Sequence, residues 1–171
     1  QGIDLSVAIN ISMYNLRHLD FPDRITYIVN QAGMDIKKLV IEITESRLVQ
    51  DLGTYLDILS RLRLKGPLLS IDDFGTGYVS MDHLKQMPFG ELKIDRAFVN
   101  GAYKDDTARA ILESSVSLAK QLEMTVVAKG VEVKEDWDLV TELGCDMVQG
   151  YYVAPPMDAE TFDAWLLKRC Q

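Results

Sequence analysis

Two adjacent aspartates, Asp72 and Asp73, follow the apolar run LLSI and precede the glycine-containing turn FGTG. Adjacent carboxylates at the end of a strand can bind two divalent cations about 3.5–4 Å apart, with one carboxylate bridging them. Such a pair of ions stabilises both the attacking and the leaving oxygen of a phosphodiester. Lys93, in the later segment ELKID, could hold a nucleophilic water or stabilise developing negative charge. These residue types therefore indicate metal-dependent chemistry on a phosphodiester.

Polar side chains also occur at or near the ends of the other apolar runs. In LVIEIT, alternation places Glu42 on the face opposite the leucine and isoleucine side chains. The same alternation directs Asp72 inward, leaves Asp73 on the turn just past the strand end, and puts Lys93 on one face with Asp95. Converging carboxylates repel one another, and a divalent cation with oxygen ligands resolves the repulsion. The complete set comprises Asn10, Glu42, Asp72, Asp73, Lys93, Asp95, Glu132 and Gln149.

Each of these groups also has a purely structural explanation. The two aspartates could belong to a solvated turn, and Glu42 with Glu45 could begin a charged loop. A half-buried Lys93 could form a salt bridge with Asp95, since lysine is seldom buried without a partner. Asn10 could cap a helix, and Gln149 could bond to backbone alone. The coincidence of all these groups at successive strand ends favours a functional site.

The elements that must position these groups are six short strands separated by amphipathic helical segments. The strands are predicted to begin near residues 5, 39, 68, 91, 125 and 147. This spacing is typical of parallel strands joined by helices, so the fold class is α/β. Polar groups at nearly every strand end favour a TIM-type (β/α) barrel over an open doubly wound sheet, and the GxGxxG and GxxxxGK[ST] motifs are absent from the sequence. Six of eight β-α units are found, so residues 1–171 are predicted to form one incomplete barrel domain.

The composition narrows the possible partners. The formal net charge is −8, which argues against a nucleic-acid surface or an anionic membrane because both require clustered Lys and Arg. The sequence has no apolar run of the length of a membrane span. Cys145 and Cys170 are far apart, which argues against a disulfide framework or a zinc site. A cytoplasmic location is expected.

Six successive blocks of the chain resemble the EAL domain, a bacterial signalling phosphodiesterase that hydrolyses cyclic di-GMP to pGpG. The blocks are VAINIS, EITES, IDDFGTGYVSM, LKIDRAFV, AKGVE and QGYYVAPPM. The resemblance implies two Mg²⁺ or Mn²⁺ ions, with Asn10, Glu42 and Asp72 holding the first and Asp72 and Asp73 the second. It also implies catalytic roles for Lys93, Asp73 and Glu132, with Lys93 contacting the nucleophilic water. Residues that support the substrate or the DFGTG loop would be Glu45, Asp95 and Gln149.

The chain departs from the family pattern in two ways. The Glu-Ala-Leu motif is expected to lie upstream of residue 1, together with the two missing units. The family reads AEGVE where this chain reads AKGVE, so Lys129 replaces a glutamate and should oppose the second metal. The alternative function is therefore a degenerate module that binds cyclic di-GMP or a protein without cleavage; an unrelated metal-dependent barrel enzyme, such as a lyase, is a third. A homodimer and attached sensory or output domains are also expected.

Overall fold

The computed structural model of the chain describes residues 5–48, 52–77 and 79–169. Six parallel strands form one sheet in the order β1 to β6, which is also their order in the sequence. Five of them begin at the predicted residue, and the first begins two residues later than predicted. The strands are β1 (Val7–Asn10), β2 (Leu39–Thr44), β3 (Leu68–Phe74), β4 (Glu91–Ile94), β5 (Thr125–Lys129) and β6 (Met147–Gln149).

Helices connect the strands as the sequence predicts. Pro22 lies in the first turn of α1, where its missing N–H has no helical partner to lose. Ser80 caps α4 and Asp105 caps α5, each by accepting a hydrogen bond from a backbone N–H of the first turn. The α-helices are α1 (Phe21–Gln31), α2 (Glu45–Leu48), α3 (Leu52–Lys65), α4 (Met81–Gln86), α5 (Asp106–Gln121), α6 (Lys134–Glu142) and α7 (Ala159–Arg169). Short 3-10 helices are η1 (Asn15–Arg17), η2 (Ile36–Lys38), η3 (Arg96–Phe98) and η4 (Ala102–Lys104).

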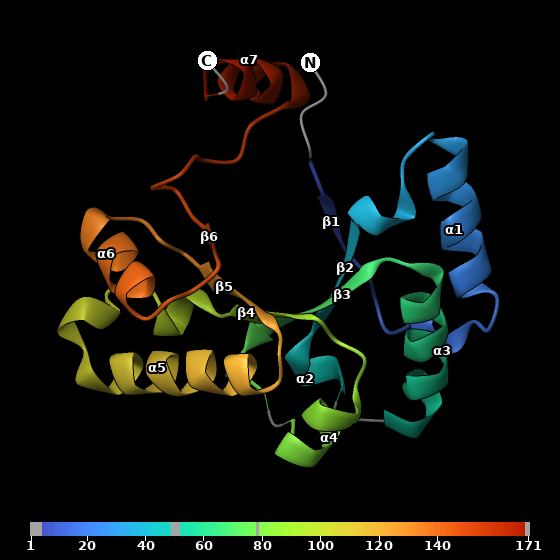
Figure 1. Cartoon of the computed structure of the whole chain (residues 1–171), viewed down its shortest axis with the longest axis horizontal. Coiled ribbons are helices and arrows are strands. Elements are labelled where there is room, and N and C mark those ends of the chain that lie inside the picture. Colours follow the sequence, from blue (N-terminus) through green and yellow to red (C-terminus); the bar gives the residue numbers. More distant parts are fainter. Residues whose placement is uncertain (1–4, 49–51, 78, 170–171) are drawn as a thin grey trace.

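The sheet curls without closing, because β1 and β6 each have only one neighbouring strand in the described part of the chain. Figure 1 shows α1 and α3 at one end of the curved sheet and α5 and α6 at the other. The helix α7 lies apart from them, at the top of this view. The fold is thus an incomplete TIM-like barrel with six β-α units, as the sequence predicts.

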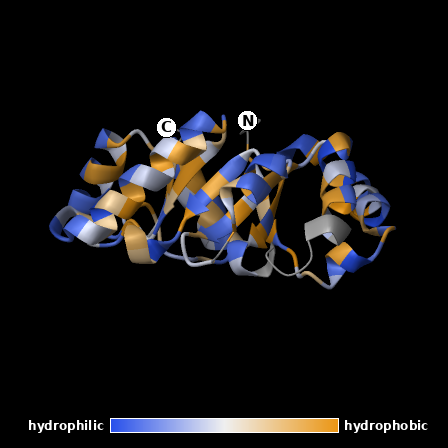
Figure 2. Cartoon of the chain, turned by 90° about the horizontal axis from the view of Figure 1, so that it is seen from below, coloured by the Kyte–Doolittle hydropathy of each residue, from blue (hydrophilic) through white to orange (hydrophobic). Residues whose placement is uncertain are grey.

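The two faces of the sheet differ in chemistry. The outer face carries side chains such as Ile41, Leu69 and Leu92, which are fully buried against the helices. Burying each of these contributes about 1.5–3 kcal/mol. Hydrophobic residues accordingly concentrate in the strands and on one side of the helices (Figure 2). The concave inner face carries polar side chains that are also buried, namely Glu42, Ser70, Asp72, Glu91 and Lys93. The hydrophobic core therefore lies between the outer face and the helices, and the polar side chains of the inner face are available for binding or catalysis.

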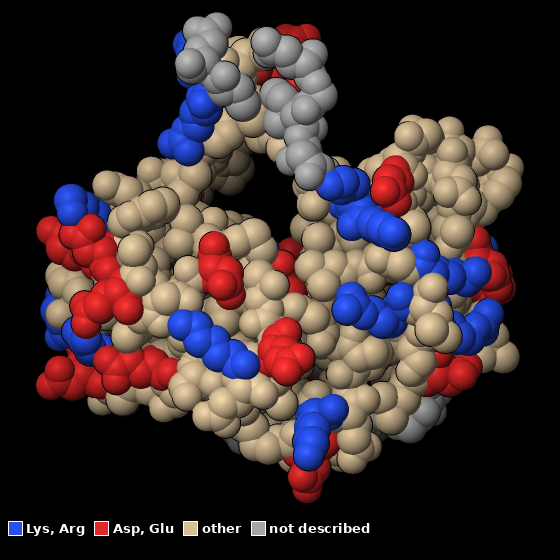
Figure 3. Space-filling view, in the orientation of Figure 1, with Lys and Arg blue, Asp and Glu red and all other residues tan. Residues whose placement is uncertain are grey.

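Two observations bear on partners. On the face shown in Figure 3, acidic and basic side chains alternate instead of forming one continuous basic surface. Among the helices within residues 5–48, 52–77 and 79–169, none combines the length and the hydropathy that a membrane span requires.

Candidate functional site

A buried ion pair lies on the inner face of the sheet. The ammonium Nζ of Lys93 on β4 donates a hydrogen bond to Oε1 of Glu42 on β2, at 2.5 Å. The two side chains are only 9% and 7% exposed. Alternation along LVIEIT correctly predicts that Glu42 faces inward. The partner of Lys93 is Glu42 and not Asp95, because Asp95 accepts a hydrogen bond from Ala97 N–H and caps η3.

A second cluster lies at the carboxyl end of the strands. The ammonium of Lys129, the last residue of β5, is 2.6 Å from Oδ1 of Asp72 and 2.6 Å from Oδ1 of Asp73. Consecutive side chains of a regular strand point to opposite faces, so one ammonium could not normally reach both. The register with β4 shifts between Ile71 and Phe74, and Asp73 has a φ of 55°. This irregularity brings both carboxylates to the same side of the sheet.

The position of Asp73 differs from the prediction. The sequence places it past the strand end, whereas β3 continues through Asp73 to Phe74. Aspartate adopts the left-handed conformation more often than most residues, but nothing in LLSIDDF predicts it inside a strand, where it accompanies the register shift with β4.

The pKa is shifted for two groups, one within the Lys129 cluster and one beside the Glu42–Lys93 pair. Burial alone would lower the pKa of Lys129, but hydrogen bonds and the charges of Asp72 and Asp73 outweigh it, so the pKa is raised. Lys129 therefore stays an ammonium ion at neutral pH. Burial raises the pKa of Glu91, which lies two residues before Lys93 on the same strand, and the positive charge of Lys93 only partly opposes this.

The loop after β3 is held by a single carboxylate. Glu45, buried at the start of α2, accepts hydrogen bonds from the backbone N–H groups of Gly75, Gly77 and Val79, at 2.8, 3.0 and 3.2 Å. A Cβ atom at Gly77 would lie 2.9 Å from Cδ of Glu45, so a side chain there would displace the carboxylate. Glu45 therefore fixes the segment that follows Asp72 and Asp73.

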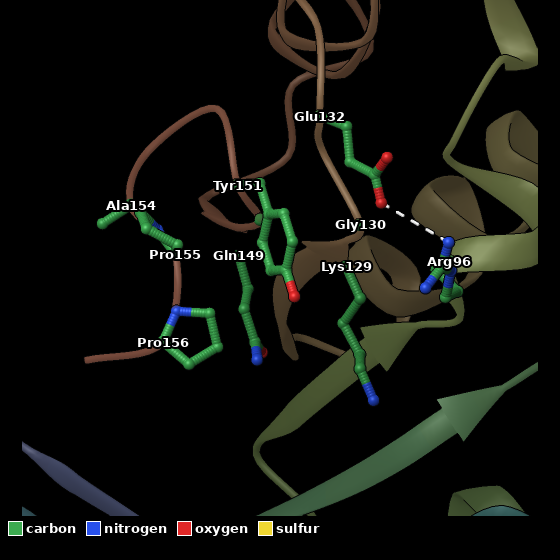
Figure 4. A pocket seen from close by; sticks show the side chains of 10 residues that line it. Arg96, Lys129, Gly130, Glu132, Gln149, Tyr151, Ala154, Pro155 and Pro156 are labelled. Carbon is green, nitrogen blue, oxygen red and sulfur yellow. Dashed lines mark hydrogen bonds and ion pairs between the residues drawn. The ribbon is translucent and has the colours of Figure 1, made fainter. Parts of the chain in front are cut away.

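A cavity of about 660 Å³ adjoins Lys129. Its wall comes from the ends of β5 and β6, the segments that follow them, and Arg96 of η3. In Figure 4 the side chains of Lys129, Gln149 and Tyr151 extend in the same direction, while Glu132 points to Arg96. The Glu132 and Arg96 side chains form an ion pair at 3.4 Å. The lining residues are Arg96, Lys129, Gly130, Glu132, Gln149, Gly150, Tyr151, Ala154, Pro155 and Pro156.

The structure brings some of the predicted site residues together and separates others. Glu42 with Lys93, and Asp72 with Asp73, form the two clusters, and Gln149 is the strand partner of Lys129. Besides Gln149 and the loop-binding Glu45, three predicted residues take part in neither cluster, namely Asn10, Asp95 and Glu132.

Each of these three has an identifiable position. Asn10 is exposed on the edge strand β1, in register with Glu42. Asp95 caps a helix, and Glu132 faces the cavity beside Arg96. Arg96 and Tyr151 are lining residues that the sequence did not indicate, because both lie just after a strand, where the direction of the chain depends on the turn.

The residues present suit an oxygen-ligated divalent cation only in part. Asn10, Glu42 and Asp72 supply amide and carboxylate oxygens, which Mg²⁺ and Mn²⁺ prefer. In the described ranges, however, no three His, Cys, Asp or Glu side chains come close enough together to hold a metal ion. Glu42 is bonded instead to the ammonium of Lys93, and Asp72 and Asp73 are both bonded to that of Lys129. Asn10, Glu42 and Asp72 therefore suit one cation by the chemistry of their oxygens, whereas an ammonium already lies between Asp72 and Asp73.

Comparisons with known proteins give one consistent family. The EAL domain matches residues 1–156. The bifunctional diguanylate cyclase/cyclic di-GMP phosphodiesterase MucR of Pseudomonas aeruginosa is 38% identical over 157 residues, which are 92% of this chain and 23% of MucR. The chain spans about a fifth of the length of curated relatives of this kind.

Solved structures agree with the sequence matches. The EAL domain of Mycobacterium smegmatis DcpA superposes with a TM-score of 0.90 at 32% identity, covering 95% of this chain and 73% of that one. Klebsiella pneumoniae BlrP1, solved as a complex with manganese and cyclic di-GMP, gives a TM-score of 0.80 at 31% identity, covering 85% of this chain and 38% of that one.

Proposed function

The chain belongs to the EAL domain family, and from that premise we propose that it binds cyclic di-GMP and hydrolyses it to pGpG with a divalent cation. The names of relatives support the substrate: MucR and NbdA of Pseudomonas aeruginosa are both called cyclic di-GMP phosphodiesterases. The BlrP1 complex with manganese and cyclic di-GMP supports the metal dependence.

The observation that carries the proposal is the position of the two lysine–carboxylate clusters beside a cavity. Glu42, Lys93, Asp72 and Lys129 all lie on the inner face of the sheet, and Lys129 also lines the cavity of about 660 Å³. That volume is within the range of sites for small organic ligands, roughly 300–1,000 Å³. A phosphodiester at the edge of the cavity would meet the acidic cluster, and its base would meet Gln149 and Tyr151.

Each group has a distinct role in this proposal. Asn10, Glu42 and Asp72 would hold Mg²⁺ or Mn²⁺, which supplies charge stabilisation and a more acidic bound water. Lys93 would donate a hydrogen bond from Nζ to the attacking water or to the negative charge that develops on the phosphate. Glu45 keeps the loop after Asp73 in place.

Two further roles concern the cavity. Tyr151 offers an exposed aromatic face for stacking a base, and Gln149 offers an amide for hydrogen bonding to it. Glu132 faces Arg96, so a catalytic role for Glu132 would require that ion pair to open. The pair is solvent-exposed, with side-chain exposures of 38% and 68%, and such pairs contribute only about 0–1 kcal/mol.

The test is hydrolysis by the complete natural polypeptide that carries this sequence. Cyclic di-GMP with Mg²⁺ or Mn²⁺ should give pGpG on a chromatogram, and Lys93→Met should lower the rate at least 100-fold. Lys37→Met is the matched control, because Lys37 is exposed and precedes β2 at the opposite edge of the sheet. The proposal fails if no pGpG forms at any metal concentration, or if Lys93→Met retains the full rate.

One specific observation favours the alternative function, which is binding without cleavage. Lys129 places an ammonium beside Asp72 and Asp73, at the position where the family pattern AEGVE has a glutamate. Tight binding of cyclic di-GMP without product would support this alternative. Homodimer formation, attached sensory or output domains and a cytoplasmic location stay predictions.

A further inference from the structure

The ammonium of Lys129 has the surroundings of a bound cation. It lies 2.6 Å from one oxygen of Asp72 and 2.6 Å from one oxygen of Asp73, and thereby bridges two carboxylates. These carboxylates belong to consecutive residues, which the irregular backbone of β3 turns to the same side. Adjacent carboxylates arranged in this way are the usual means of bridging a divalent ion. Here the chain supplies the positive charge from its own β5 strand.

The position of the ammonium is well defined and also accessible. Its side chain is 19% exposed, that of Asp72 is 10% exposed and that of Asp73 is 36% exposed. The carboxylate of Asp72 is therefore largely removed from water, whereas that of Asp73 remains partly hydrated. Because Lys129 lines the cavity, a phosphate at the cavity edge could contact the same ammonium.

The net charge of the site is consistent with Lys129 taking the place of one divalent ion. Glu42, Asp72 and Asp73 carry three negative charges, and Lys93 and Lys129 offset two of them. A glutamate at position 129 would make the cluster more negative by two charges, which is the charge of one divalent cation. The same final charge is therefore reached with Lys129 and one ion, or with a glutamate and two ions.

We propose that Lys129 acts as a built-in cation between Asp72 and Asp73, so that this chain binds one divalent ion where a glutamate at this position would allow two. In this arrangement the ammonium also contacts the phosphodiester directly. The first part concerns metal content alone, while the second rests on the proposed function because it takes cyclic di-GMP as the ligand.

The competing explanation is an ordinary salt bridge that opens when metal is added. A lysine side chain has four rotatable bonds and could turn into the cavity, which would leave both aspartates available to a second ion. The two explanations differ in the number of ions that saturate the protein, so ion stoichiometry separates them without any measurement of activity.

The experiment counts bound Mn²⁺ by electron paramagnetic resonance titration of the folded, complete polypeptide. We expect one tightly bound Mn²⁺ for the wild type and two for Lys129→Glu. Lys37→Glu is the matched control: it makes the same charge change at the opposite edge of the sheet and should leave the count at one. Two ions in the wild type would overturn the proposal, and so would equal counts in the wild type and Lys129→Glu.

A second variant covers the case in which Lys129→Glu does not fold. Lys129→Gln keeps a similar length and removes the charge, so it should gain a second, weaker Mn²⁺ site. If this variant holds the same number of ions as the wild type, the built-in cation is refuted by that measurement alone.

The ligand part is tested by calorimetric titration of cyclic di-GMP in excess EDTA. The wild type should bind without metal, and Lys129→Gln should bind at least 10-fold more weakly, while Lys37→Gln should match the wild type. Equal affinities of Lys129→Gln and the wild type would overturn this contact. A wild type that binds no cyclic di-GMP even with Mn²⁺ would instead overturn the proposed function and leave the ion count to decide the role of Lys129.

Discussion

The two lysine–carboxylate clusters have the same construction and different surroundings. Lys93 on β4 reaches Glu42 on β2, and Lys129 on β5 reaches Asp72 on β3, so each lysine bonds to a strand two positions away in the sheet. In a curled sheet, inward-facing side chains of alternate strands share a layer, which explains both pairings. The Glu42–Lys93 pair is closed to solvent, whereas the Lys129 cluster is open on the Asp73 side.

The solvent exposure of a lysine–carboxylate pair determines how much its loss destabilises the fold. A buried pair has lost its hydration, so removing one partner leaves a charge with no compensation. In the cluster at the edge of the cavity, Asp73 keeps part of its hydration, and a ligand in the cavity can reach the ammonium of Lys129. We therefore expect the Glu42–Lys93 pair to contribute more to the free energy of unfolding than the Lys129 cluster does, and Lys129 to set how many ions bind between the aspartates.

The largest expected effect comes from breaking the buried pair. Glu42→Gln leaves Lys93 charged and unpaired, so the free energy of unfolding should fall by about 3–5 kcal/mol in urea denaturation. The double variant Glu42→Gln/Lys93→Met removes both charges and should recover most of the loss. A loss below about 1 kcal/mol for the single variant would show that the pair is not desolvated.

Breaking the open cluster should cost less. Lys129→Met leaves Asp72 and Asp73 without their ammonium, but Asp73 can be solvated. We expect a loss of about 1–2 kcal/mol, between the values for exposed and buried pairs. Urea denaturation of this variant against Lys37→Met provides the measurement. If Lys129→Met loses more stability than Glu42→Gln, the ranking of the two clusters is wrong.

A pH experiment sharpens the comparison through Glu91, which is buried beside the closed pair. Its pKa in the folded chain is raised above the ordinary 4.5, so the stability linked to its proton is present below that pH and lost as pH rises through the folded pKa. Glu91→Gln removes this loss. Relative to the wild type, the variant should therefore gain stability between pH 4 and pH 7, as measured by denaturation at each pH. A constant difference across that range would contradict the raised pKa.

The smallest expected effect is that of salt. The Debye length falls to about 3 Å at 1 M ionic strength, and screening acts on exposed charges far more than on buried ones. Raising NaCl from 0.05 M to 1 M should reduce the stability cost of Lys129→Met by a few tenths of a kcal/mol and leave that of Glu42→Gln unchanged. An equal salt effect on both variants would indicate equal access of solvent to the two clusters.

The sequence predicted the elements well because their patterns are local. Near-continuous apolar runs such as LVIEIT mark strands buried on the outer face, and their starts agree with the structure to within two residues. Alternation also placed Glu42 on the inner face. The backbone at Asp73 could not be predicted, because its left-handed conformation compensates for a register shift that only the pairing with β4 creates.

The sequence alone is thus sufficient to predict six parallel strands, a polar inner face and a set of residues whose chemistry suits a phosphodiester. It also identified Lys129 as the residue of unexpected charge. The tertiary structure decided which charges meet: Lys93 with Glu42 instead of Asp95, and Lys129 with both aspartates. The physical reason is the curl of the sheet, which brings alternate strands within reach of one another across the interior and thereby selects partners that no spacing along the chain specifies.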